Sequence, residues 1–411
     1  MTEKRETAEV VIVGAGPAGS ALAAHLASRG HDALLLDRAT FPRDKTCGDG
    51  LTPRAILALA RLGALTALRT NDYHEIHGAR LIAPNGHAWD MRFADYDLGL
   101  PAYGLVIPRR DLDETLLRHA IARGARFREA VDVTGPLHDP AASGRQPAVV
   151  GIQGKRGGES FRVQARLTAL ATGAAIGLLR TFDVLQAMPP GVNAIRGYFD
   201  GVADLEDRFE FYFERDLAPG YAWVFPMAEG RANIGLGLFS RGRAGPAPNL
   251  RVGLSEFIRR HPRLRDATPV GPAKGYPIRI DFPSSRVIGE GYLVVGEAAG
   301  LVNPVTGEGI DLALESAEMA ADAISAALAA GDTTARGLRA YERALHARYA
   351  GFFRGVRLLL RLATGPRALN VLIRQAQHRP RLARTIAGIN LGVTSPWQAF
   401  SPRTWWEILR R

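Results

Sequence analysis

The segment 8–39 constrains the fold of this chain more than any other. It reads as a β-strand, a tight G-x-G-x-x-G turn, a helix and a second strand that ends on an acidic residue, Asp37. The three glycines of the turn are Gly14, Gly16 and Gly19. In such a turn the first glycine permits the bend, the second lets the backbone approach a pyrophosphate, and the third packs the helix onto the strand. The segment therefore predicts a strand–helix–strand unit that binds a dinucleotide.

Asp37 narrows the choice of dinucleotide. It lies eighteen residues after Gly19, at the end of the second predicted strand, where an acidic side chain binds ribose hydroxyls. The helix predicted over 17–28 directs its N-terminal amides at the pyrophosphate. Because a carboxylate in this place disfavours a 2′-phosphate, the sequence predicts FAD or NAD rather than NADP.

Length and composition indicate a globular protein of more than one domain. The 411 residues suggest two to three domains, and 46% apolar with 23% charged residues are typical of a soluble protein. Cys47 is the only cysteine, which excludes a disulfide scaffold within the chain and a cysteine-based metal cluster. His74 and His77, in a loop-like segment, have no further ligand nearby, so no metal site is predicted. The polar N-terminal segment and the lack of a long apolar run predict a cytoplasmic protein without a membrane span.

The positive charge is concentrated in the C-terminal part. The net charge is +11, and the segment 336–411 holds fifteen arginines against Glu342 and Glu407. Within 351–375, apolar side chains and arginines fall largely on different faces of a predicted helix. Such a helix can lie on an anionic membrane, or it can cap the rest of the fold with its arginines in water. No nucleic-acid-binding module accompanies the charge, so no nucleic acid partner is predicted.

A second segment with ligand-binding character begins near residue 291. It reads as a short strand over 292–295, the pair Gly296–Glu297, the loop N-P-V-T-G-E-G-I at 303–310 and a helix from about Gly309 onward. The glycines of the loop let a flat ring lie against the backbone, and the amides of a helix N-terminus follow at once. Apolar residues at helical spacing predict that one face of this helix belongs to the core.

Aromatic residues alternate along the segment 207–240. Its alternation of apolar and polar residues predicts antiparallel strands with one buried face. Tyr221, Trp223 and Phe225 share one face, because every second residue of a strand points the same way. These rings either line an apolar pocket or belong to the core of the sheet.

The loop F-P-R-D-K-T-C-G-D-G at 41–50 places the single thiol, Cys47, beside two glycines. Gly48 and Gly50 allow the backbone to come close to a ligand. A small polarisable thiol packs against a flat ring with little steric demand. A buried core cysteine is the alternative interpretation.

Several of these motifs together resemble a known family. The G-x-G-x-x-G turn and the late stretch G-E-A-A-G…N-P…G-E-G-I are similar to the FAD monooxygenase superfamily with the p-hydroxybenzoate hydroxylase fold. Within it, F-P-R-D-K-T-C-G-D-G-L, G-Y-A-W-V-F-P and N-P-V-T-G-E-G-I resemble the geranylgeranyl reductase family, and the likeness extends to about residue 330. Members of that family reduce isolated double bonds in the prenyl chains of lipids, quinones or chlorophyll precursors.

The resemblance implies a fold that combines α/β and α+β architecture. A discontinuous Rossmann-type FAD-binding domain is expected, with an inserted antiparallel β-sheet domain for the substrate and a C-terminal helical region. The expected boundaries are 1–75, 102–180 and 275–332 for the FAD-binding domain, 76–101 and 181–274 for the substrate domain, and 333–411 for the basic helical region.

The resemblance also implies a set of FAD-contacting residues. These are Gly14, Gly16, Ala18, Gly19, Asp37, Arg38, Cys47, Gly48, Arg109, Glu297, Pro304, Gly307, Gly309 and Ile310. Glu297 stands where the family usually has an aspartate that holds the ribityl chain, and Thr172–Gly173 replaces an Asp-Gly pair of the superfamily. The second departure leaves the electron donor open among NAD(P)H, ferredoxin and a quinol.

The function implied is an FAD-dependent oxidoreductase that reduces isolated C=C bonds in a prenylated lipid or quinone. Cys47, Tyr221 and Trp223 are the implied catalytic residues, and Cys47 and Tyr221 are the candidates for proton transfer. The basic segment 336–411 would give peripheral contact with the inner face of an anionic membrane. Two alternatives stay open: a flavin monooxygenase or halogenase acting on an aromatic or polyketide substrate, and a non-redox flavoprotein scaffold.

Overall fold

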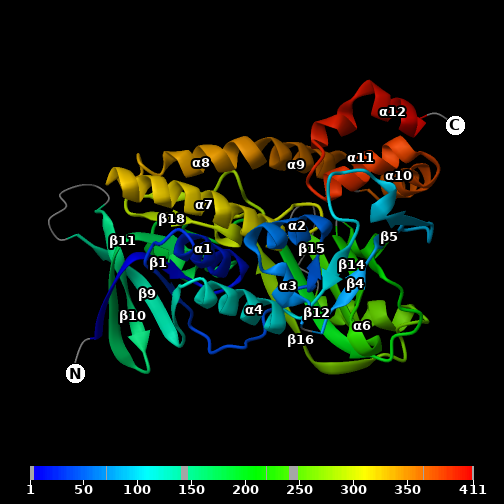
Figure 1. Ribbon diagram of the computed structural model, residues 1–411. Helices are drawn as coiled ribbons and strands as arrows, with labels where there is room; N and C mark the ends of the chain where they lie inside the picture. Colours follow the sequence, from blue (N-terminus) through cyan, green and yellow to red (C-terminus); the bar gives the residue numbers. More distant parts are fainter. Residues whose placement is uncertain are drawn as a thin grey trace.

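The computed structural model (Figure 1) describes residues 4–70, 72–139, 147–218, 220–239, 249–363 and 365–409. Two large β-sheets lie next to each other, one nearer the N-terminus and the other nearer the C-terminal helices. A three-stranded sheet and the helices complete a mixed α/β fold, as expected from the sequence.

The first large sheet has eight strands from three distant parts of the chain. Its main order is β17 (Ile288–Gly289), β18 (Tyr292–Val294), β11 (Glu159–Leu170), β1 (Lys4–Val13), β2 (Ala33–Leu36) and β8 (Arg126–Arg128), and β10 (Val149–Arg156) and β9 (Val131–His138) extend from β11. The strands from β18 to β8 are parallel. All four residues of β2 are buried, which is the pattern of a parallel strand covered on both faces.

Helices cover this sheet. They are α1 (Pro17–Ala27), α4 (Arg109–Ala122), α5 (Ile176–Thr181), α7 (Ile310–Ala330) and α8 (Arg339–Leu345). The helix α1 packs between α4 and α7, and α8 lies along α7 (Figure 1). Because α1 is apolar on most sides and flanked by both helices, nine of its residues are buried.

The second large sheet has seven strands. Their order is β16 (Thr268–Ile278), β12 (Val192–Asp200), β15 (Ala232–Phe239), β14 (Gly220–Pro226), β13 (Arg208–Tyr212), β5 (Gly78–Ile82) and β6 (Ala88–Arg92). All neighbours are antiparallel except β13 and β5, which are parallel, so the predicted antiparallel sheet is correct for all but one pair. Helix α6 (Leu250–Arg260) packs on one face of the sheet, where Ala222 and Val224 are fully buried.

A small sheet lies beside the helices α2 (Pro53–Leu62) and α3 (Leu65–Leu68). Its strand order is β3 (Gly50–Leu51), β7 (Gly104–Val106) and β4 (His74–Ile76). The loop-like conformation predicted around His74 is therefore wrong, because pairing with β7 makes this segment a strand. The His74 ring lies 2.9 Å from the Asp207 carboxylate, and no group of metal ligands occurs among the described residues.

The C-terminal region packs against both large sheets. It continues α8 through a π-helical turn (His346–Ala350) into α9 (Gly351–Ala363), α10 (Pro366–His378), α11 (Pro380–Asn390) and α12 (Pro402–Leu409). Tyr341, Tyr349 and Phe353 are buried in the core of the first sheet. Ile373 and Ala387, from α10 and α11, pack with the residues of β5 and β6. The region therefore caps the fold, one of the two arrangements that the sequence left open.

The 3-10 segments are Phe93–Asp95, Arg215–Leu217, Ala228–Gly230, Gly296–Ala299 and Pro396–Phe400. Within the described ranges, every helix is too short or too polar to span a bilayer.

Candidate functional site

A cavity of about 880 Å³ lies between the two large sheets. Its wall includes the glycine turn before α1, the loop 43–48, strands β12 and β14, and the loop that leads into α7. The two signatures that the sequence places nearly three hundred residues apart therefore face the same space.

The glycine turn forms one end of this cavity. Gly14 has a φ of +108°, and a Cβ there would lie 2.4 Å from the carbonyl oxygen that follows β11. A Cβ on Gly19 would lie 1.8 Å from the Gly14 carbonyl oxygen, so both residues are required for close packing. Gly16 is different, because a Cβ there would meet only the guanidinium groups of Arg43 and Arg109, at 3.7 and 3.9 Å. Only Gly16 opens onto free space.

The first turn of α1 faces this open space without a partner. Gly16 is the N-cap residue, Pro17 begins the helix, and no side chain among the described residues caps the first amides. Uncapped amides at a helix N-terminus bind anions such as a pyrophosphate. The turn therefore fits the diphosphate of a dinucleotide.

Asp37 lies at the rim of the cavity with both carboxylate oxygens held. Its Oδ2 accepts a hydrogen bond of 2.8 Å from the Ala15 amide, and its Oδ1 accepts one of 2.8 Å from the Ala39 amide. The Asp37 side chain is buried but lines the cavity, and the adjacent residue Arg38, which is exposed, lines it too. This placement fits a carboxylate that binds ribose hydroxyls.

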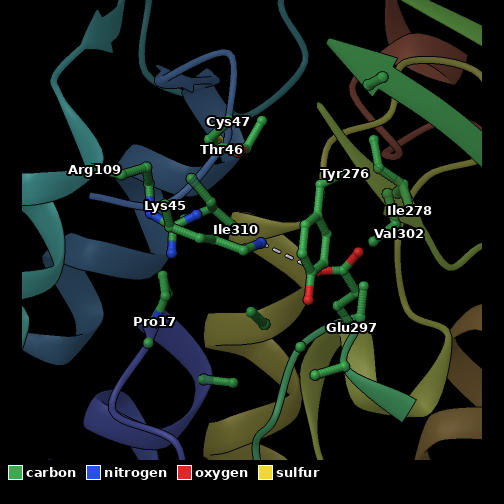
Figure 2. Close-up of a pocket in the computed structure, with 18 of the residues that line it drawn as sticks. Pro17, Lys45, Thr46, Cys47, Arg109, Tyr276, Ile278, Glu297, Val302 and Ile310 are labelled. Carbon is green, nitrogen blue, oxygen red and sulfur yellow. Dashed lines mark hydrogen bonds and ion pairs between the residues drawn. The ribbon is translucent and has the colours of Figure 1, made fainter. Parts of the chain in front are cut away.

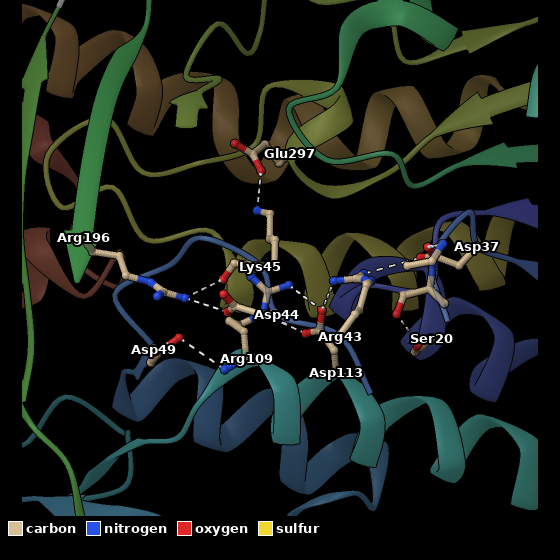
Figure 3. Close-up of polar contacts among 12 residues, drawn as sticks. Ser20, Asp37, Arg43, Asp44, Lys45, Asp49, Arg109, Asp113, Arg196 and Glu297 are labelled. Carbon is tan, nitrogen blue, oxygen red and sulfur yellow. Dashed lines mark hydrogen bonds and ion pairs between the residues drawn. The ribbon is translucent and has the colours of Figure 1, made fainter. Parts of the chain in front are cut away.

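Arg43 and Arg109 share one buried carboxylate, Asp113 (Figure 3). Arg109 donates from Nε and Nη2 at 2.7 and 2.8 Å, and Arg43 donates from Nη1 at 2.9 Å. Burial alone would lower the pKa of Arg109, but Asp113 and the hydrogen-bonded Cys47 side chain raise it, so the guanidinium stays charged. Two fixed cations thus face the opening at Gly16.

The loop that carries Cys47 is fixed against the second sheet. Cys47 is half-buried and lines the cavity. Its backbone carbonyl oxygen accepts a 2.9 Å hydrogen bond from the Asn233 side chain. A Cβ on Gly48 would lie 3.1 Å from the Phe225 ring, and one on Gly50 would lie 3.0 Å from the Phe209 ring. These glycines let the loop pack against aromatic rings, a reason that the sequence alone did not indicate.

Asp49 is a site residue that sequence reasoning missed. It is fully buried with a φ of +63°, and its Oδ2 accepts hydrogen bonds of 2.8 Å from Tyr198 and Asn233. Asn233 in turn accepts a 3.0 Å hydrogen bond from the Trp223 indole. Burial raises the pKa of Asp49 to about 6, against the opposing effect of Arg196 and these donors. An acidic residue between two glycines was the available sequence signal.

Ion pairs connect the loop 43–48 to β12, to β16 and to the 3-10 segment Gly296–Ala299. Lys45 reaches across it toward Glu297, at 3.3 Å, as Figure 2 shows. Asp44 accepts from Arg196 and Lys274, both at 2.7 Å. Burial raises the pKa of Asp44, but the two cations outweigh burial and lower it. Lys45, Arg196 and Glu297 all line the cavity, and the sequence had singled out only Glu297.

An aromatic wall forms the other side of the cavity. Tyr221, Trp223 and Phe225 all line it from β14, and the rings of neighbouring residues contact one another at centroid distances of 6.2 Å. The Tyr221 hydroxyl donates a hydrogen bond to the Thr306 carbonyl oxygen. Burial and the nearby Glu308 carboxyl raise the pKa of Tyr221. The pocket interpretation of these rings is therefore supported over the plain core interpretation.

The loop before α7 is fixed from the C-terminal region. The Asn303 side chain accepts a 2.9 Å hydrogen bond from the Val305 amide and donates a 3.0 Å hydrogen bond to the Asn390 carbonyl oxygen. Gly307 has a φ of +69°, and a Cβ there would lie 3.3 Å from the Tyr221 hydroxyl. Gly309 is the N-cap residue of α7, and as a glycine it offers no side chain to cap the first amides.

Most of the residues expected from the sequence line this one cavity. Those that line it are Gly14, Gly16, Ala18, Asp37, Arg38, Cys47, Gly48, Arg109, Tyr221, Trp223, Glu297, Gly307, Gly309 and Ile310. Gly19 and Pro304 are buried behind the wall. Thr172 and Gly173 also line the cavity, and the Glu297 carboxylate lies 3.5 Å from the position of a Cβ on Gly173.

Comparison with known proteins identifies the family. Residues 7–176 match the FAD binding domain, and residues 194–273 match the geranylgeranyl reductase catalytic domain. The chain is 35% identical over 384 residues to a menaquinone reductase of Mycolicibacterium smegmatis, covering 89% of this chain and 86% of that protein. The chain belongs to the geranylgeranyl reductase family. This membership confirms the resemblance that the motifs indicated, and the FAD-binding match supports FAD as the cofactor.

A second relative is similar in sequence, and two solved structures of lower identity have the same fold. The chain is 31% identical over 346 residues to digeranylgeranylglycerophospholipid reductase 2 of Methanopyrus kandleri, covering 81% of each chain. A geranylgeranyl bacteriochlorophyll reductase-like protein from Thermoplasma acidophilum superposes with a TM-score of 0.80 at 24% identity, over 95% of this chain and 96% of that one. A myxobacterial chondrochloren halogenase gives a TM-score of 0.72 at 23% identity, over 93% and 90%. The last two show the fold alone.

Proposed function

We propose that this protein is an FAD-dependent oxidoreductase that reduces isolated C=C bonds in the prenyl chain of a lipid or quinone. The observation that carries the proposal is the single cavity shared by the glycine turn of α1 and the aromatic face of β14. Family membership supports the same activity, since two relatives are named menaquinone reductase and digeranylgeranylglycerophospholipid reductase 2.

The cofactor would occupy the side of the cavity formed by the first sheet. Asp37 would bind the ribose, and the α1 amides with Arg43 and Arg109 would bind the pyrophosphate. Glu297 would hold the ribityl chain, and the backbone from Gly307 to Ile310 would lie along the ring beside Cys47. When bound and reduced, FAD supplies a hydride to an alkene carbon.

The substrate would occupy the side formed by the second sheet. The rings of Tyr221, Trp223 and Phe225 offer an apolar surface that excludes water and holds an alkene in place. An unactivated alkene has few polar groups for a protein to recognise, so its position must be set by such apolar contacts. Cys47, Tyr221 and Trp223 remain the proposed residues next to the reacting carbons.

Because the first sheet would bind the cofactor and the second sheet the substrate, we divide the chain into a cofactor unit and a substrate unit. The proposed cofactor unit comprises 1–75, 102–180 and 275–332, and the substrate unit comprises 76–101 and 181–274. Strand β16 of the second sheet runs to Ile278, which favours moving that boundary by four residues. The helical region 333–411 would hold the two units together, because it packs on both.

The C-terminal region also offers a surface for peripheral contact with an anionic membrane. Exposed apolar side chains occur there at Leu362, Val371, Val393, Trp397 and Trp406. Exposed arginines, among them Arg361 and Arg374, lie near them in sequence. Such a mixture suits a protein that takes a lipid substrate from a bilayer, and no nucleic acid partner is proposed.

Anaerobic reduction followed by mixing with a polyprenyl quinone or a prenylated phospholipid tests the proposed function. Reoxidation of the flavin by either compound, with a product heavier by two hydrogens per bond reduced, supports a prenyl reductase and identifies the substrate class. Substrate-dependent oxygen consumption would instead support a monooxygenase, and neither response would support a non-redox scaffold. Separate reduction by NADH, NADPH, reduced ferredoxin or a quinol identifies the electron donor.

A further inference from the structure

Two acidic residues at the start of α7 line the cavity: Glu308 in the preceding loop and Asp311 in the first helical turn. Asp311 is only 3% exposed, and its Oδ1 is buried without a hydrogen-bond partner. Within the described residues, no hydrogen bond or ion pair involves the Glu308 carboxyl. Other carboxylates of the wall are held: Asp44 by two cations, and Glu297 by Lys45.

The nearest cation is already committed to a third carboxylate. Arg54 of α2 donates from Nε and Nη2 to Glu315 of α7, at 2.7 and 2.6 Å. Its remaining Nη1 lies 3.5 Å from Asp311. The other groups that face this cluster are Tyr349, which donates to Glu315 at 2.6 Å, Arg348 at 3.8 Å from Glu315, and Tyr221 of β14.

Three carboxyl groups therefore surround one buried guanidinium. Glu315 is the carboxylate that pairs with Arg54. Burial raises the pKa of Glu315, but the hydrogen bond and the charge of Arg54 outweigh burial and lower it. Burial and the charge of Asp311 raise the pKa of Glu308, and burial and the charge of Glu315 raise the pKa of Asp311. Arg54 opposes both increases, and backbone hydrogen bonds also oppose that of Asp311. Two close carboxyls that lack a counter-ion of their own retain a proton.

The hydroxyl next to this pair is less suited to donate a proton. Tyr221 already gives its hydrogen bond to the Thr306 carbonyl oxygen, and Glu308 raises its pKa further. Glu308 follows Thr306 by two residues and faces the same cavity as the Tyr221 and Trp223 rings. Its carboxyl thus lies close enough to Tyr221 to affect that hydroxyl, and it has no hydrogen-bond partner among the described residues.

We propose that Glu308 and Asp311 share one proton in the resting protein, and that Glu308 delivers it to the substrate. This role rests on the proposed function. The Glu308 O–H bond breaks and a C–H bond forms at one alkene carbon, while the other carbon takes up the hydride equivalent that the reduced flavin provides. The C=C bond thereby gains two electrons and two hydrogens, and the carboxylate regains a proton from water. Asp311 acts as a positioning residue that keeps the proton on its neighbour.

Infrared spectroscopy of the full-length, FAD-loaded protein tests the shared proton without any turnover. At pH 8, where Asp49 is ionised, the wild type should show a protonated carboxyl band that shifts in D₂O. Glu308→Gln and Asp311→Asn should each abolish it, because each variant removes one carboxyl of the pair and leaves the other ionised beside Arg54. Glu318→Gln, on the same helix but away from the cavity wall, should leave the band unchanged. A band that persists in both cavity variants would overturn the proposal.

Single-turnover reoxidation tests the delivery of the proton. Glu308→Gln should slow reoxidation by a polyprenyl substrate about 100-fold, the contribution of a general acid, and Glu308→Asp should restore part of the rate. Near-ultraviolet circular dichroism and FAD content establish that each variant is folded and loaded. A Glu308→Gln rate within about twofold of the wild type would overturn the donor role. If no prenyl compound reoxidises the wild type, the proposed function fails, while the infrared result still decides the shared proton.

Discussion

Asn233 donates a 2.8 Å hydrogen bond to Asp49, which joins the cysteine loop to a strand 184 residues later in the chain. The same side chain donates to the Cys47 carbonyl oxygen at 2.9 Å and accepts from the Trp223 indole at 3.0 Å. One fully buried amide therefore fixes the proposed cofactor side of the cavity against its aromatic side.

Removal of that amide should destabilise the protein. Asn233→Ala leaves Asp49 and the Trp223 indole short of a partner in the interior, so the free energy of unfolding should fall by about 3 kcal/mol. Urea unfolding of the FAD-loaded protein measures the change. Asn193→Ala, at an exposed position of β12, is the matched control and should change it by less than about 0.5 kcal/mol. Equal stability of the two variants would contradict the bridging role.

Asp49 should make stability depend on pH. Its pKa is about 6 in the folded protein against 3.8 unfolded, so the folded state binds its proton more tightly. As pH rises from about 4 to about 7, Asp49 should therefore lower the free energy of unfolding by up to about 3 kcal/mol. The difference between the wild type and Asp49→Asn, followed by urea unfolding across this range, isolates that contribution. A difference that is independent of pH would show that Asp49 does not titrate there.

Substitutions of two glycines in the G-x-G-x-x-G turn should have different effects, one on cofactor binding and the other on stability. Gly16→Ala meets no backbone atom, so the variant should fold, but its methyl group would occupy the opening and weaken FAD binding about tenfold or more. Gly14→Ala should instead lower stability, because of its φ of +108° and the 2.4 Å contact. FAD titration monitored by fluorescence, together with thermal unfolding of each apoprotein, distinguishes the two effects. Normal FAD affinity in Gly16→Ala would be inconsistent with a pyrophosphate at this opening.

Tyr221→Phe and Cys47→Ala should slow alkene reduction while FAD is retained. The Tyr221 variant loses the hydrogen bond to Thr306, which loosens the loop that carries Glu308, so the rate should fall by about tenfold or less. Its pH profile should keep the shape of the wild-type profile, because the proton source is unchanged. Single-turnover rates across the pH range make this comparison. Unchanged turnover in either variant would remove that residue from the mechanism.

The exposed tryptophans of the C-terminal region should contribute to membrane binding. Replacement of Trp397 and Trp406 by serine removes two rings that are 48% and 65% exposed, so binding to anionic vesicles should fall about tenfold. Ile121→Ser, at a site on α4 that is 45% exposed, is the control. Cosedimentation with vesicles that contain acidic phospholipid measures the effect. Equal binding by the double variant and the wild type would exclude these residues as a contact surface.

The sequence by itself determined the family, the cofactor class and a set of candidate residues, most of which line the cavity. It could do so because the constraints on Gly14, Gly16 and Asp37 are local: a bend, an open backbone and a strand end within one strand–helix–strand unit. Alternation along β14 likewise sufficed to place Tyr221 and Trp223 on one face, since a strand repeats every two residues.

Only the tertiary structure decided which distant groups meet. Nothing near Cys47 in sequence indicates that Gly48 packs on the Phe225 ring or that Asn233 binds the loop. In the same way, the loop G-E-G-I shows an acidic residue, but not that Arg54 is already paired with Glu315, 261 residues later. Burial and pairing set whether a carboxyl keeps its proton, and both depend on neighbours that come from other parts of the chain.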